Sequence, residues 1–168
     1  MAKRKSLRSD ECPMARSLDI VGDQWSLLII RDAFDGMRRF GEFQQSLGMA
    51  KNILADRLKN LVQEGVLDQV PASDGTAYQE YVLTPKGQGL FPVFVSLRHW
   101  GEAHLYAKGE QHSVLIERSS GRPVRGIELR THDGKPLKPD DTLVKKLPPK
   151  KVTRPGLRAK VKEVPVKA

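Results

Sequence analysis

The segment 50–64 places polar side chains on one face of a predicted helix whose opposite face is apolar. Leu54, Leu58 and Leu61 recur at i, i+4 and i+7, the spacing of a buried helical stripe. The opposite face carries Asn52, Ala55, Asp56, Lys59, Asn60 and Gln63, with Lys51 and Arg57 at its flanks. Asparagine, glutamine and lysine donate hydrogen bonds to base edges and phosphates, and the small Ala55 permits close approach to a duplex. This pattern favours a helix that reads nucleic acid. Asp56 would repel a phosphate, and an ordinary solvated helix face remains the alternative.

A shorter helix is predicted immediately before this one, over 40–47. Phe40, Phe43 and Leu47 recur at i, i+3 and i+7 and form one apolar stripe. Gly48 then permits a positive φ, so the chain can turn sharply at the helix end. Helix, tight turn and longer helix in this order predict a helix-turn-helix.

Two strand-like runs follow the second helix, over 66–70 and 78–83. The residues between them, PASDGT at 71–76, have the composition of a turn. The sequence therefore predicts a β-hairpin beside the helix-turn-helix, which is the arrangement of a winged helix-turn-helix. The predicted fold class is mainly α with a β-wing, followed by a small β-rich C-terminal appendage and a disordered basic tail.

Three blocks of the sequence together resemble the HxlR-type winged helix-turn-helix regulators. They read CPMARSLDIVGDQWSLLIIRDAF, FGEFQQSLGMAKNILADRLKNLVQEGVLDQ and YQEYVLTPKGQGLFPVFVSLRHWGE, and they span 12–105. The resemblance implies a homodimeric bacterial transcription factor of the wider MarR-like class. It also implies that the helix holding Lys51 to Glu64 enters the major groove, while the 66–84 hairpin touches backbone or minor groove. Tyr78 stands where relatives often carry a basic residue, which weakens the case for a phosphate contact there.

The candidate DNA contacts combine this helix with other cations. Arg38 and Arg39 precede a helix N-terminus, where a phosphate is favoured, although a solvated loop is the alternative. The full set of predicted DNA-binding residues is Arg38, Arg39, Lys51, Asn52, Ala55, Arg57, Lys59, Tyr78, Lys145, Lys146, Lys150, Lys151, Arg154 and Arg158.

The positive charge of the chain is concentrated near its end. The formal net charge is +9, yet residues 1–110 contain 14 Lys+Arg and 14 Asp+Glu. Residues 145–168 hold nine basic residues and one acid, and four prolines interrupt them. This composition predicts a disordered basic tail that attracts any polyanion. The domain predictions are a flexible N-terminus at 1–11, the winged domain at 12–108, a small β-appendage at 109–144 and the tail at 145–168.

An apolar surface is predicted on two helices outside the helix-turn-helix. Met14 and Leu18 lie on a helix opened by Pro13, and Phe94, Leu97 and Trp100 lie on a helix after the wing. These five residues are the candidate homodimer interface. The alternative is that they only cover the domain's own core.

Cys12 is the only cysteine, so no internal disulfide is possible and a reducing cytosol is expected. A free cysteine is often a small buried hydrophobe. In the family that this chain resembles, a cysteine in such a Cys-Pro setting is the sensing thiol in several members. A helix N-terminus favours a thiolate, and Lys5 and Arg8 are close in sequence, while Asp10 and Glu11 oppose the effect. Cys12 is thus a candidate redox or electrophile sensor.

Other chemistry is not indicated. The sequence contains no GxSxG, HExxH or phosphate-binding glycine loop, so no enzyme is expected. His112 and His132 alone cannot form a zinc site in the appendage, and neither a metal nor a cofactor is predicted. The longest apolar run, at 27–30, is too short for a membrane span, and no secretory signal is seen. We therefore expect a cytoplasmic, nucleoid-associated protein with no membrane partner and an unknown small-molecule effector.

Two functions from different classes fit these observations. The first is a sequence-specific transcriptional regulator that acts as a homodimer on double-stranded DNA, with a redox response through Cys12. The second is an architectural DNA-binding protein whose basic tail drives largely sequence-independent binding. Because the first 110 residues carry no net charge, their few cations must be well placed, which favours selective readout.

Overall fold

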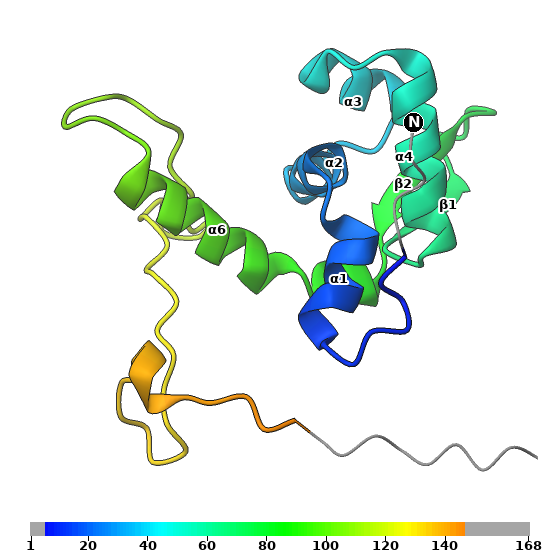
Figure 1. Cartoon of the computed structure of the whole chain (residues 1–168). Coiled ribbons are helices and arrows are strands. Elements are labelled where there is room, and N and C mark those ends of the chain that lie inside the picture. The colour runs from blue at the N-terminus through cyan, green and yellow to red at the C-terminus, as the bar shows by residue number, and fades with distance from the viewer. Residues whose placement is uncertain (1–5, 147–168) are drawn as a thin grey trace, which may run out of the picture. The chain divides into compact units, whose positions relative to one another are not determined.

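The computed structural model describes residues 6–146 of the chain. The chain divides into two compact units, Met1–Ile127 and Glu128–Ala168. The first unit holds the regular elements in the order α1 (Pro13–Val21), α2 (Gln24–Phe34), α3 (Phe40–Leu47), α4 (Lys51–Gln63), β1 (Leu67–Pro71), β2 (Gln79–Leu83), α5 (Pro85–Gln88) and α6 (Phe91–His104) (Figure 1). The described part of the second unit contains one short 3-10 helix, η1 (Pro139–Asp141).

The helix boundaries follow local signals that the sequence already displays. The Asp23 side chain accepts a hydrogen bond from the Ser26 backbone N–H and caps α2, and the Thr84 hydroxyl accepts one from the Gly87 N–H and caps α5. Gly48 ends α3 with φ of +60°, so the predicted left-handed turn between α3 and α4 is confirmed.

The core of the first unit joins the helix-turn-helix to α2 and the wing. Ile29, Ile30, Phe43, Leu54, Leu58 and Leu61 are all 0% exposed. The three leucines form the buried stripe predicted for α4, and Val66 and Leu67 extend the core into the wing. Packing of this stripe fixes which face of α4 meets solvent.

The wing is a two-stranded antiparallel hairpin. Its register runs from Leu67 opposite Leu83 to Pro71 opposite Gln79, so each strand starts one residue later than the sequence indicated. Proline is accepted at Pro71 because this position ends an edge strand. The hairpin tip is closed by the Ala72 N–H, which donates to the Tyr78 carbonyl at 3.0 Å. Pro92 lies in the first turn of α6, which begins as a new helix after α5.

Within the described residues, the segments before α1 and after α6 have little regular structure. The described residues of the predicted flexible N-terminus are held in place, because the Ser6 hydroxyl and the Leu7 N–H both donate to the Asp19 carboxylate on α1. The segment 109–144, predicted to be a β-rich appendage, forms β structure only in the single bridges Ile116 to Pro123 and Arg130 to Pro136. The division between the compact units follows Ile127 and therefore lies within the segment 109–144.

Candidate nucleic-acid interface

The polar face of α4 is open to solvent. Lys51, Asn52, Ala55, Asp56, Lys59 and Gln63 are exposed, whereas Asn60 is half-buried. Lys51 and Asn52 stand in the first turn of the helix, and Lys59 lies two turns further along the same exposed side. Because Leu54, Leu58 and Leu61 anchor the opposite side in the core, this polar face is held rigidly outward. The helix can therefore present several donors to a groove together.

Arg57 forms an ion pair within the domain. Its Nε lies 3.2 Å from Asp23 Oδ1, the carboxylate that also caps α2. This ion pair fastens α4 to the start of α2. The predicted DNA contact by Arg57 stays a prediction, but the guanidinium already has a partner within the domain.

Arg38 and Arg39 are partly exposed, and both side chains also contact acidic residues of the wing. Arg39 Nη2 pairs with Asp74 Oδ2 at the hairpin tip and lies 3.6 Å from Glu80 Oε1. Arg38 Nη1 lies 3.6 Å from Glu80 Oε2, and the Arg38 carbonyl accepts a hydrogen bond of 2.8 Å from the Tyr81 N–H. A backbone hydrogen bond and several ion pairs thus connect the start of α3 to the wing.

The N-terminus of α3 is occupied by its own carboxylate. Glu42 Oε2 accepts hydrogen bonds from the backbone N–H groups of Arg39, at 2.8 Å, and Arg38, at 2.7 Å. These two hydrogen bonds lower the pKa of Glu42 below its ordinary value. The Glu42 carboxylate thus occupies the N–H groups of the two residues that immediately precede α3.

The remaining predicted contacts lie elsewhere. Tyr78 is 70% exposed at the start of the returning wing segment. Lys145 and Lys146 are exposed in the second unit. Lys150, Lys151, Arg154 and Arg158 lie outside the described residues.

Sequence reasoning missed the acidic members of this cluster, Asp74 and Glu80. In the sequence they are two acidic residues of a predicted hairpin, with no motif that links them to Arg38 or Arg39. Glu80 lies on the face of β2 opposite Tyr81 and Leu83, the strand residues that pack against the core, so strand alternation gave no signal of its burial.

Cys12 is exposed and is the N-cap residue of α1. Its backbone N–H donates to Asp10 Oδ1 at 2.8 Å. Arg8, which the sequence suggested as a cation supporting the thiolate, instead pairs with Glu64 and lies 3.7 Å from Asp19. Lys5 lies outside the described residues. Arg16, one turn into α1, donates its Nε–H to the Asp10 carbonyl.

The candidate dimer residues divide into two groups. Met14 is 69% exposed, Leu97 51% and Trp100 54%, and Leu18 is exposed as well. Phe94 is half-buried and packs against the core, with its ring 5.5 Å from that of Phe34. Phe94 therefore helps to cover the domain's own core, and its place in a dimer interface stays a prediction.

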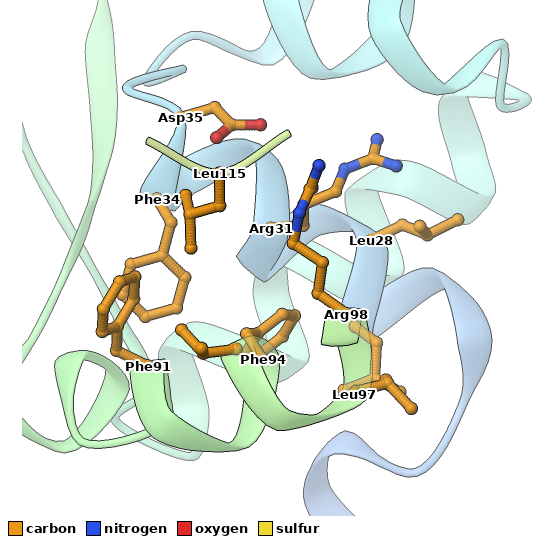
Figure 2. Close-up of a pocket in the computed structure, with 11 residues that line it drawn as sticks. Leu28, Arg31, Phe34, Asp35, Phe91, Phe94, Leu97, Arg98 and Leu115 are labelled. Carbon is orange, nitrogen blue, oxygen red and sulfur yellow. The ribbon is translucent and has the colours of Figure 1, made fainter. Parts of the chain in front are cut away.

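A pocket of about 310 Å³ lies between α2 and α6 (Figure 2). Phe34, Phe91 and Phe94 form its aromatic wall, and Leu115 crosses it from the segment after α6. Its two guanidiniums are already paired, Arg31 with Asp32 at 2.6 Å and Arg98 with Glu102 at 2.9 Å. The pocket is therefore mainly an apolar hollow, and Leu97 belongs both to it and to the exposed surface of α6.

Two other kinds of feature are absent from residues 6–146. These residues contain no group of three or more His, Cys, Asp or Glu side chains placed to hold a metal ion. No helix in this range combines the length and the apolar character needed to cross a membrane.

The α3–turn–α4 unit, the outward polar face of α4 and the following hairpin define a winged helix-turn-helix. Residues 20–109 match the model of the HxlR-like helix-turn-helix family, and the chain belongs to that family. The resemblance of the sequence to HxlR-type regulators is thereby confirmed.

Individual relatives agree with this assignment. The chain is 44% identical over 92 residues to the uncharacterised HTH-type transcriptional regulator Rv3095 of Mycobacterium tuberculosis, a match covering 55% of this chain and 58% of that protein. The crystal structure of PA1607, described as a transcription factor, matches with a TM-score of 0.81 and 54% identity over 84% of this chain and 99% of PA1607. The redox regulator HypR in its reduced form matches with a TM-score of 0.52 and 26% identity, covering 56% of this chain and 94% of HypR.

Proposed function

We propose that this protein is a sequence-specific DNA-binding transcriptional regulator that acts as a homodimer. The observation that carries the proposal is the exposed donor face of α4, held rigidly by a buried leucine stripe in a chain of the HxlR-like helix-turn-helix family. In this proposal α4 enters the major groove, where Asn52 donates to base edges and Lys51 and Lys59 contact bases or phosphates. The wing then lies along the neighbouring backbone or minor groove.

Dimerisation is supported by the exposed apolar side chains of α1 and α6. Met14, Leu18, Leu97 and Trp100 are large apolar residues left open to solvent. Large apolar side chains exposed on a helix are typical of an interaction surface. A two-fold dimer would bury these side chains and present two α4 helices to successive major grooves.

Selection of bound duplexes from a random-sequence pool tests the proposal. A homodimeric reader should enrich one motif with two-fold symmetry. An architectural protein driven by its tail would enrich no motif, because phosphate contacts carry no sequence information. The architectural function is the second candidate, and the nine cations in 145–168 favour it.

Removal of residues 145–168 is expected to weaken binding to all DNA sequences alike. If about 4 to 6 of the tail's cations contact phosphate, the slope of log affinity against log salt should fall by roughly 4–5, at about 0.9 for each contact. Titrations of full-length and truncated protein at several salt concentrations measure this slope. An unchanged slope would show that the tail does not bind DNA.

The redox proposal concerns Cys12. An exposed thiol at the N-cap of α1, in a chain similar to the redox regulator HypR, supports a response to oxidants. Diamide removes the thiol hydrogens and joins Cys12 either to its counterpart in a second copy or to a small thiol. Either product would shift α1 and thereby the spacing of the two α4 helices, so we expect oxidised protein to lose affinity for its operator.

Cys12→Ser is the matched variant, because it replaces only the sulfur by oxygen and serine is well accepted at a helix N-cap. Operator binding is measured before and after diamide for both proteins. Loss in the wild type alone supports the proposal. Retained affinity in the oxidised wild type, or equal loss in both proteins, would show that Cys12 is not the switch.

A further inference from the structure

The wing contains a buried carboxylate that faces the two arginines at the start of α3. Glu80 is 3% exposed, and its Oε2 accepts no hydrogen bond from any described residue. Its Oε1 accepts one hydrogen bond from the Ser73 hydroxyl at 3.2 Å. A buried carboxylate without an opposite charge is strongly disfavoured. Glu80 therefore depends on Arg38 and Arg39, each 3.6 Å from one of its oxygens.

Asp74, the other carboxylate near Arg39, accepts a hydrogen bond from Arg39 Nη2 but is much more exposed than Glu80. Its side chain is 45% exposed at the tip of the hairpin. It also accepts hydrogen bonds from the Thr76 hydroxyl at 2.6 Å and from the Thr76 N–H at 3.1 Å. The Thr76 hydroxyl bond and then Arg39 lower the pKa of Asp74 below its ordinary value. Because Thr76 satisfies this carboxylate independently, Asp74 can release Arg39 at small cost, as exposed ion pairs generally can.

We propose that Glu80 is a positioning residue that holds Arg38 and Arg39 at the root of the wing, and that Asp74 occupies the place on Arg39 that a DNA phosphate takes. The inference rests on the proposed DNA-binding function and adds a mechanism to it. On binding, Arg39 exchanges Asp74 for a phosphate oxygen and stays beside Glu80. Its guanidinium is suited to this exchange because its planar array of donors can contact two anions at once.

The proposal predicts opposite effects for the removal of two negative charges. Asp74→Asn should strengthen binding of a selected operator by about 2- to 5-fold, because Arg39 no longer has to leave a charged partner. Glu80→Gln keeps the shape and the acceptor for Ser73 but removes the charge that orients both arginines. Removal of a negative charge by itself would strengthen binding to the negatively charged DNA. Glu80→Gln should nevertheless weaken binding by about 3- to 10-fold, because the arginines are no longer oriented.

Asp68→Asn supplies the matched control. Asp68 is exposed on β1 of the same wing, and among residues 6–146 its side chain accepts a hydrogen bond only from the N–H of Gln69. The Asp68→Asn variant therefore measures how much DNA affinity changes when the wing loses a negative charge that is not in contact with an arginine. In an Arg39→Gln background, the gain from Asp74→Asn should disappear, because the exchanging guanidinium is absent.

The experiment measures binding of full-length protein to the selected duplex by fluorescence anisotropy at one fixed salt concentration, together with thermal unfolding. Equal gains from Asp74→Asn and Asp68→Asn would overturn the exchange, and a gain from Glu80→Gln would overturn the positioning role. If Glu80→Gln fails to fold, the Asp74 and Asp68 comparison and the Arg39 background decide the proposal. The same assay tests the DNA-binding function separately. That function requires that the wild type binds the duplex and that Lys59→Ala loses this binding.

Discussion

Alanine in place of Asn52 or Lys59 is expected to weaken operator binding by about 1–3 kcal/mol for each base that the side chain reads. Both side chains are exposed on α4 and support no core packing, so the free energy of unfolding should change by less than about 0.5 kcal/mol. In a homodimer each substitution acts in both half-sites, so the effect per dimer is expected to be about twice as large.

Anisotropy titrations with the selected operator and with mismatched duplexes measure this effect. A base contact by Asn52 should also relax the preference at one position of each half-site, whereas a phosphate contact by Lys59 would weaken all sequences alike. Lys108→Ala makes the same charge change as Lys59→Ala, but after α6 instead of on α4, and should leave specificity unaltered. Wild-type affinity in both the Asn52 and Lys59 variants would show that α4 does not enter the groove as proposed.

Phe43→Ala is expected to lower the free energy of unfolding by about 3–5 kcal/mol. Phe43 is 0% exposed, and its ring packs edge-on against Tyr81 of the wing with centroids 6.4 Å apart. The substitution leaves a cavity where α3, α4 and the wing meet, so it also weakens the support of the interface.

Urea unfolding followed by circular dichroism measures this change. Gln45→Ala, at an exposed position of the same helix, should stay within about 0.5 kcal/mol of the wild type. A cost below about 1 kcal/mol for Phe43→Ala would mean that α3 is not anchored through this ring.

The helices were predictable because their signals are local. The apolar spacing of Leu54, Leu58 and Leu61 identified both the existence of α4 and its outward face. The cap at Asp23 and the positive φ at Gly48 require only the identity of one residue and its neighbours. Winged architecture followed from the order of these elements.

The charge pairing at the interface was not predictable in the same way. Arg57 meets Asp23 across two helices, and Arg39 meets Asp74 and Glu80 across 35 and more residues of chain. Such pairs depend on the register of the wing and on how the wing packs against α3. Neither can be predicted from a local sequence pattern. A residue's charge therefore indicated its chemistry but not whether a partner within the fold already holds it.

Exposure on α6 was also decided by packing. Phe94 and Leu97 are three residues apart and looked equivalent as parts of one apolar surface. The structure packs Phe94 on the core and leaves Leu97 half exposed beside the pocket. The difference arises because α6 touches the core along its first turns only, a tertiary feature that helical periodicity cannot report.

The most direct test of the central claim is a footprint of the full-length protein on the DNA that flanks its own gene. We expect one protected site with two-fold symmetry, whose half-sites lie about 10–10.5 base pairs apart or a multiple of that spacing. Protection of this site should occur at a protein concentration at least about 10³ lower than protection of the flanking DNA. Uniform protection that begins at one concentration along the whole fragment would contradict sequence-specific regulation and favour the architectural function.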